Sequence, residues 1–194
     1  MYRAMALYFL RKGVDPKEAE EIGRSCPEVD VTIRYQEGVQ QVLLNGEDVS
    51  GLIRTEEVGN MASAVSGYMP VREKLVELQK QLAAKENVIM DGRDIGTCVL
   101  PDAPAKIYLT ASVEVRAVRR YKELLEKGME ADLKEIEKDI EDRDYRDMHR
   151  EHSPLKQAED AVLLDTSSMT LDQVVEEILK IVREKGYKAA GGCA

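Results

Sequence analysis

Apolar residues recur along the chain with two different periods, which divide it into helical and extended segments. Residues 2–11 form an apolar helix that Gly13 ends. The pattern Asp15-Pro16-x-Glu18 predicts that a second helix starts here with a cap, a first-turn proline and a capping-box acid. From residue 29 to residue 35, apolar and polar positions then alternate, which is typical of a strand with one buried face.

A small antiparallel unit follows this first strand. Gln36-Glu37-Gly38 predicts a turn, residues 39–44 predict a second strand, and Asn45-Gly46 is a strong hairpin signal leading into residues 47–49. Helical sequence lies on both sides, so we interpret residues 27–50 as the centre of an inserted subdomain. Two helices come next.

The first of these helices is capped by Thr55 and runs toward Ser66, where Gly67 breaks it. Pro70 opens the second, whose apolar residues fall on one face. Taken by themselves, Ser63 and Arg72 on these helices are expected to be solvated surface positions.

The second half alternates short apolar runs with long helices. Strands are predicted at residues 88–90, 105–109 and 161–165. Ser112 caps a helix that reaches Lys127 before Gly128, and a charged helix covers about residues 131–145. Thr170 and Gln173 box a last helix that ends near Gly186, and residues 188–194 are expected to be frayed. This order favours an α/β fold with parallel strands and helical crossovers.

Composition narrows the class of protein. The 194 residues suffice for one good-sized domain with a small second lobe, and the net charge of −9 argues against nucleic acid or an anionic membrane as a partner. No apolar run approaches the ~20 residues of a membrane span and no signal peptide opens the chain, so we expect a cytoplasmic protein. Cys26, Cys98 and Cys193 lack metal-ligand spacing, and with only two histidines we expect reduced thiols and no zinc site.

Candidate chemistry is concentrated directly after the predicted strand at residues 88–90. Asp91, Arg93 and Asp94 are interleaved with Gly92 and Gly96. Ligands of open α/β sheets bind beyond the carboxyl ends of strands, where Arg93 would offer a planar fork for a phosphate and Asp94 an acceptor for an amine or hydroxyl. The alternative is a solvated turn with a local ion pair.

The two helices between residues 112 and 150 are too charged to lie in a core. They carry arginines interspersed with aspartates at positions 116, 119, 120, 142–144, 146, 147 and 150. One interpretation is a solvated helical hairpin with i,i+3 and i,i+4 salt bridges. The other is a mobile lid whose arginines close on phosphates. Arg3, on the apolar first helix, would by itself be a surface arginine.

Seven segments together resemble the bacterial cytidylate kinase family in order and spacing, over nearly the whole chain: MYRAMALY, LNGEDVSGLIRTEEVGNMAS, VREKLVELQ, MDGRDIGT, KIYLTAS, RRYKELLEKG and DRDYRDMHRE. The resemblance implies a P-loop nucleoside monophosphate kinase, with a parallel sheet covered by helices on both faces. Residues 1–26, 71–112 and 155–194 would be its core, 27–70 its nucleoside-monophosphate-binding insert and 113–154 its lid. It further implies phosphoryl transfer from ATP, with Mg²⁺, to CMP or dCMP, and a monomer.

Residue roles are carried over from the same resemblance. It implies that the substrate phosphate binds Arg3, Arg93 and Arg150, that cytosine is recognised by Ser63, Arg72 and Asp94, and that Arg143 and Asp147 contact the sugar. It also implies that the lid residues Arg119 and Arg120, together with Arg143, stabilise the transferring phosphoryl group.

The chain departs from the family at one motif. Family members begin with a strand and the phosphate-binding loop GxxxxGK[ST], which residues 1–194 do not contain. We therefore expect a fragment or mis-started form of a full kinase, which would bind CMP weakly and lack kinase activity without that segment. Two alternatives are a non-catalytic CMP-binding module from a decayed paralogue and a kinase for another nucleoside monophosphate.

Overall fold

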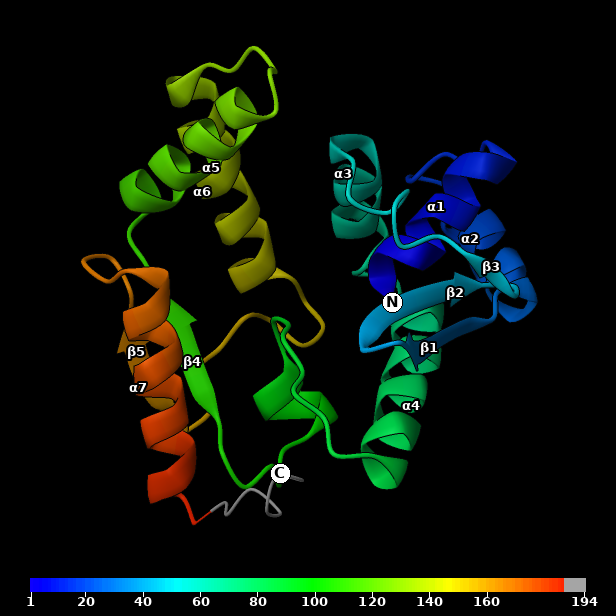
Figure 1. Ribbon diagram of the computed structural model, residues 1–194. Coiled ribbons are helices and arrows are strands. Elements are labelled where there is room, and N and C mark those ends of the chain that lie inside the picture. The colour runs from blue at the N-terminus through cyan, green and yellow to red at the C-terminus, as the bar shows by residue number, and fades with distance from the viewer. Residues whose placement is uncertain (187–194) are drawn as a thin grey trace. The chain divides into compact units, whose positions relative to one another are not determined.

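The computed structural model describes residues 1–186, which divide into two compact units at Val88 (Figure 1). Helices and strands occur in both units, and one of the two sheets is parallel. The α/β class predicted from the sequence is therefore confirmed. Among residues 1–186, no helix is both long and apolar enough to cross a membrane.

The first unit contains four α-helices, one 3₁₀ turn and a three-stranded sheet. Its elements are α1 (Tyr2–Lys12), α2 (Ala19–Ser25), the 3₁₀ turn η1 (Cys26–Glu28), β1 (Val31–Gln36), β2 (Val39–Leu44), β3 (Glu47–Asp48), α3 (Glu56–Val65) and α4 (Met69–Lys85). Two sequence signals act as predicted here. Gly13 ends α1 in a left-handed conformation, and the hydroxyl of Thr55 caps α3.

The sheet is antiparallel in the order β1-β2-β3. Both of its turns place two successive residues at positive φ, Glu37 and Gly38 in one and Asn45 and Gly46 in the other. Such turns match the right-handed twist of the strands they join, which is why Asn-Gly predicts a hairpin so strongly. Both predicted turns are confirmed.

One hydrophobic core joins the helices of this unit to its sheet. Met5 and Phe9 of α1 are fully buried, as are Val65 of α3 and Leu75 of α4, and Val31 of β1 belongs to the same cluster. Full burial of such side chains contributes about 1.5–3 kcal/mol each. The predicted division into core and insert stays a prediction.

Two local predictions for this unit are wrong. The second helix begins at Ala19, because the Asp15 carboxylate accepts from the Lys17 backbone N–H at 2.8 Å and closes a turn instead of capping a helix. The predicted apolar face of the first strand also fades, since Val31 is buried but Tyr35 is 72% exposed. Alternation sets the face of a strand, but burial needs a neighbour to cover it.

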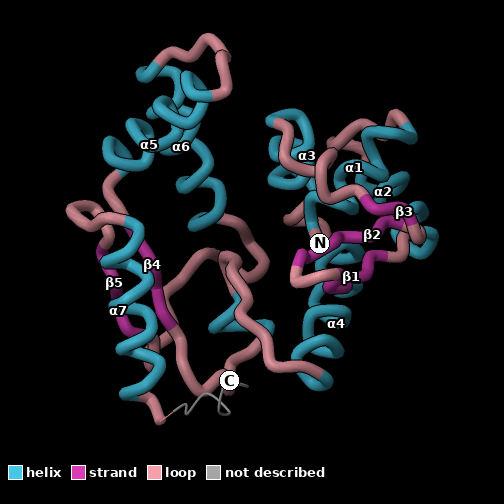
Figure 2. The backbone as a smooth tube through the Cα atoms, in the orientation of Figure 1, coloured by secondary structure: helices cyan, strands magenta, loops and turns pink. Residues whose placement is uncertain are grey.

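The second unit contains a two-stranded parallel sheet and three long helices (Figure 2). Its elements are the π-helical turn η2 (Ile95–Val99), β4 (Ile107–Thr110), α5 (Val113–Glu126), α6 (Leu133–His149), β5 (Val162–Asp165) and α7 (Leu171–Glu184). Strands β4 and β5 pair from Ile107 with Val162 to Thr110 with Asp165, and α5 and α6 lie between them in the chain. The predicted parallel pairing is confirmed.

Side-chain caps set the helix starts in this unit. Ser112 caps α5, Asp132 caps α6, and Thr170 with Gln173 forms a complete capping box on α7. The charged helix runs to His149, four residues beyond the predicted Tyr145, and so carries Asp147 in its last turn. Residues 188–194, predicted to be frayed, and Cys193 lie outside the described residues.

The strand predicted at residues 88–90 is wrong. These residues have no regular structure, and Ile89 is fully exposed. A strand is stabilised by hydrogen bonds to a neighbouring strand, and no strand within residues 1–186 pairs with residues 88–90. The charged segment that follows it nevertheless adopts a defined conformation.

Candidate functional site

The segment after residue 90 places Asp94 at the start of a tight backbone turn. The Asp94 carbonyl accepts from the N–H groups of Cys98 (2.9 Å) and Val99 (3.2 Å), which closes η2. A Cβ on Gly92 would lie 2.8 Å from the side chain of Ile95, so this close approach requires glycine. The carboxylate of Asp94 is buried, with 6% of the residue exposed.

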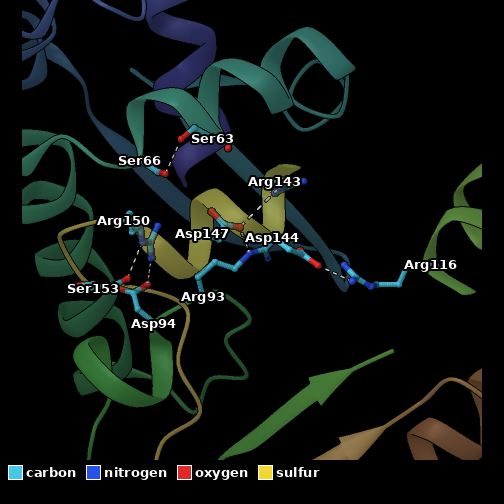
Figure 3. Close-up of polar contacts among 10 residues, drawn as sticks. All are labelled: Ser63, Ser66, Arg93, Asp94, Arg116, Arg143, Asp144, Asp147, Arg150 and Ser153. Atoms are coloured by element: carbon cyan, nitrogen blue, oxygen red, sulfur yellow. Dashed lines mark hydrogen bonds and ion pairs between the residues drawn. The ribbon is translucent and has the colours of Figure 1, made fainter. Parts of the chain in front are cut away.

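Arg93 is held by a carboxylate on α6. Its Nε donates to Asp147 Oδ2 at 2.9 Å, and Arg143 Nε lies 3.9 Å from the same oxygen (Figure 3). The residue Asp147 is buried, whereas the side chains of Arg93 and Arg143 are each about two-fifths exposed. One buried carboxylate thus faces two arginines from different parts of the chain.

Arg150, just after α6, lies beside the second buried carboxylate. Its Nη2 is 3.8 Å from Asp94 Oδ1, and its Nε donates to the backbone carbonyl of Ser153 at 2.7 Å (Figure 3). The Nη2 atom is buried and makes no hydrogen bond within the described part of the chain. A buried guanidinium nitrogen of this kind is a ready donor for an anionic ligand.

The structure therefore brings five sequence-predicted site residues of the second unit together: Arg93, Asp94, Arg143, Asp147 and Arg150. Their arginines come from the segment just before η2, from α6 and from the residue that follows it, while the two aspartates are buried. Guanidinium groups converging from separate elements suit a phosphate dianion, which each fork can bind through two parallel hydrogen bonds.

The predicted lid helices form a hairpin of their own. Helices α5 and α6 lie side by side (Figure 1), joined by an ion pair of 2.6 Å between Arg116 Nη2 and Asp144 Oδ2. Arg120 pairs with Glu123 one turn further along α5. The salt bridges of the solvated-hairpin interpretation are therefore present, and the lid motion stays a prediction.

Arg119 of α5 contacts the turn after β5. It donates to the carbonyl of Thr166 at 2.6 Å and to that of Met169 at 3.3 Å. Thr166 is itself buried and its hydroxyl donates to the Thr110 carbonyl. Arg119 is thus anchored in the turn after β5, which Thr166 ties to the end of β4, and its predicted contact with phosphates is untested.

In the first unit, Arg3 belongs to α1 and its side chain reaches the start of α3. Its Nη1 donates to the carbonyls of Ile53 (3.0 Å) and Thr55 (3.2 Å). A Cβ on Gly59 would meet the guanidinium at 3.2–3.5 Å, so the glycine provides the space in which this group lies. Arg3 is fixed by tertiary contacts instead of being a loose surface side chain.

Ser63 and Arg72 lie on α3 and α4 of the same unit. The backbone carbonyl of Ser63 accepts from the Ser66 hydroxyl at 2.8 Å, which occupies no atom of the Ser63 side chain. Arg72 is only 5% exposed, so its expected surface location is wrong. A buried arginine is retained only where its charge is compensated.

Sequence reasoning missed three residues that support the site, namely Gly59 beneath Arg3, Ser153 as acceptor for Arg150, and Thr166 as acceptor for Arg119. The first two contribute no polar side-chain atom to these contacts, so residue type gave no signal. Cys26 and Cys98 are free thiols. Within residues 1–186, no group of three His, Cys, Asp or Glu side chains could hold a metal ion.

Comparison with known proteins assigns the chain to one family. The family model described as cytidylate kinase matches residues 1–184. A cytidylate kinase of Lactobacillus johnsonii is 50% identical over 185 residues, covering 95% of this chain and 80% of the relative. Those of Caldicellulosiruptor saccharolyticus and Cupriavidus necator are 46% and 45% identical, covering 98% and 93% of this chain and 83% and 79% of the relatives.

Proposed function

The chain belongs to the cytidylate kinase family, and on that premise we propose that it transfers the γ-phosphoryl group of ATP to CMP or dCMP, giving CDP or dCDP. The observation that carries the proposal is the paired arrangement of Arg93 on Asp147 and Arg150 beside Asp94. Both arginines are held by their own Nε atoms, which keeps each fork in a defined direction.

Binding of the substrate phosphate follows from charge and geometry. Arg93 and Arg150 supply two planar forks, and we assign Arg3 of the first unit as the third phosphate ligand from the resemblance. Charge-assisted hydrogen bonds of this kind contribute about 1.5–3 kcal/mol each. Asp147 and Arg143 are assigned to the sugar on the same basis.

Selection of the base is assigned to Asp94 with Ser63 and Arg72. Cytosine presents an exocyclic amine next to two acceptors, for which a carboxylate and an arginine are the complementary pair. Uracil presents an acceptor where cytosine has its amine, so Asp94 would face it with a repelling oxygen. A site built to pair a polar group rejects an analogue that leaves the group unpaired.

Phosphoryl transfer itself needs positioning and charge neutralisation more than covalent chemistry. We assign the neutralising role to Arg143, Arg119 and Arg120. Mg²⁺ is inferred to arrive with ATP as part of the co-substrate, and no residue within 1–186 is assigned to the ion. We further infer a cytoplasmic monomer.

A coupled ADP-release assay with CMP, dCMP and UMP, run on a form of the protein that includes the phosphate-binding loop, tests this proposal. We expect a higher kcat/KM for CMP and dCMP than for UMP, and we expect Asp94→Asn to erode the preference because an amide can donate to the uracil carbonyl. Asp91→Asn, an exposed neighbour, is the matched control. Equal kcat/KM for CMP and UMP in the unmutated form that includes this loop would contradict the assignment.

A further inference from the structure

Ser153 has a backbone conformation that its neighbours do not explain. Its φ is +48°, in the left-handed region that residues other than glycine rarely adopt, and it directly precedes Pro154. The other two non-glycine residues at positive φ within residues 1–186, Glu37 and Asn45, lie in hairpin turns that require this conformation. Ser153 lies in the loop between α6 and β5, so its conformation needs a different reason.

The carbonyl of Ser153 provides that reason. It accepts a hydrogen bond from the Nε–H of Arg150 at 2.7 Å (Figure 3), and the Arg150 side chain is only 13% exposed. Two residues further along, the Leu155 N–H donates to the Asp147 carbonyl at 2.7 Å and returns the loop to α6. Two hydrogen bonds therefore hold the loop to the end of α6. One joins Ser153 to Arg150, and the other joins Leu155 to Asp147, which also binds Arg93.

We propose that Ser153 is a positioning residue for substrate binding, because its left-handed backbone presents the carbonyl that aims Arg150 at the phosphate of CMP. The inference rests on the proposed function, which makes Arg150 a phosphate ligand. Conformations that are costly for a side chain persist where the surrounding structure enforces them, and they are often found at ligand-binding sites.

The mechanism makes specific demands on residue 153. The acceptor is the main-chain carbonyl, so loss of the hydroxyl in Ser153→Ala should have little effect on CMP binding. Glycine adopts positive φ readily, so Ser153→Gly should also retain binding. A β-branched residue disfavours this conformation, so Ser153→Val should move the carbonyl and release Arg150.

The experiment measures CMP and cytidine affinity by titration calorimetry. Ser153→Val should weaken CMP binding about tenfold, the lower end of the loss expected for one charge-assisted hydrogen bond. Cytidine, which lacks the phosphate, should bind as it does to the unmutated protein. Glu37→Val is the matched control, since it places the same side chain at a φ of +53° in the other unit and should leave CMP affinity unchanged.

Two further variants separate this inference from the proposed function. If Arg150→Ala weakens CMP binding and Ser153→Val does not, Ser153 has no positioning role although Arg150 is a ligand. If Arg150→Ala itself has no effect on CMP binding, Arg150 is not a phosphate ligand, and the assignment on which this inference rests is wrong. Adding Ser153→Val to Arg150→Ala should cause no further loss, because both changes remove the same interaction. Should Ser153→Val not fold, Ser153→Thr tests the same constraint more mildly.

Discussion

Arg93 and Asp147 are 54 residues apart in the sequence and form a direct hydrogen bond of 2.9 Å between Nε and Oδ2. The carboxylate side chain is 9% exposed and the guanidinium side chain 39%. The bond uses Nε alone, so it directs the arginine without occupying the two terminal nitrogens that would bind a phosphate. Asp147 therefore orients the Arg93 side chain, in addition to its assigned contact with the sugar.

Asp147→Asn should weaken CMP binding through Arg93. The amide oxygen can still accept from Nε but carries no charge, so the guanidinium is held less firmly in the direction of the phosphate. We expect an increase in the Kd for CMP of about ten- to a hundredfold by calorimetry.

Asp142→Asn, an exposed change on the same helix, should leave the Kd for CMP unaltered. A double-mutant cycle with Arg93→Ala isolates the coupling. The effects of the two changes should be clearly less than additive, and full additivity would mean that Asp147 acts on CMP without Arg93.

Arg93→Ala and Arg150→Ala should each weaken CMP binding about ten- to a hundredfold, since each removes one fork from the substrate phosphate. Arg146→Ala is the control, because this exposed arginine of α6 has no assigned role. Affinity for CMP is measured by calorimetry. Equal affinities in all three variants would show that the phosphate is bound elsewhere.

Gly59→Val should disturb Arg3. A Cβ at this position lies 3.2 Å from Nη2 and 3.3 Å from Nη1, and the branched side chain of valine extends further into the same space. The guanidinium must then leave the carbonyls of Ile53 and Thr55. We expect CMP affinity to fall about tenfold, with a small loss of stability.

Ala64→Val provides the comparison for the Gly59 substitution. It adds a valine to the exposed side of the same helix and should alter CMP affinity little. Equal affinity of Gly59→Val and the unmutated protein would show that Arg3 either does not bind the phosphate or is not confined by the glycine.

Glu28 should make the stability of the first unit depend on pH. The Lys12 ammonium, and after it the Tyr8 hydroxyl, donate to its carboxylate and hold the pKa of Glu28 below the ordinary value. The unfolded chain thus binds a proton here more readily than the folded one. The stabilisation is complete above the unfolded pKa and is lost as the pH falls through the lower folded pKa.

Glu28→Gln removes the titrating group, so urea unfolding at about pH 7 and about pH 3 should differ less in this variant than in the unmutated protein. Glu37→Gln, at an exposed turn, should keep the original difference. An unchanged pH dependence in Glu28→Gln would mean that this carboxyl contributes nothing to it.

Local signals predicted much of the fold because each is complete within a few residues. The Ser112 and Thr55 caps and the Thr170–Gln173 box satisfy helix N–H groups three residues away, and Asn45-Gly46 forms its own turn. The strand expected at residues 88–90 failed for the opposite reason. Three apolar residues become a strand only beside a partner, which the segment itself does not contain.

The site was less accessible to sequence reasoning. The family resemblance indicated which arginines bind the substrate. The structure places five of the predicted residues close together in one unit, namely Arg93, Asp94, Arg143, Asp147 and Arg150. The resemblance could not supply which carboxylate holds which arginine, because those pairs form between distant segments. Gly59 makes room for Arg3 because it has no Cβ, and Ser153 binds Arg150 through its main-chain carbonyl. Neither role can be recognised from the type of side chain.

The two sheets close loops of very different length, which bears on the order in which they form. Strands β1 and β2 are joined by the two-residue turn at Glu37-Gly38, whereas the β4–β5 pairing brings Thr166 to Thr110 across 56 residues. Closing a loop costs about 0.6 kcal/mol for each doubling of its length, and non-local pairings form slowly. In pulse-labelling hydrogen exchange during refolding, the amides of the hairpin should therefore gain protection before those of the parallel pair.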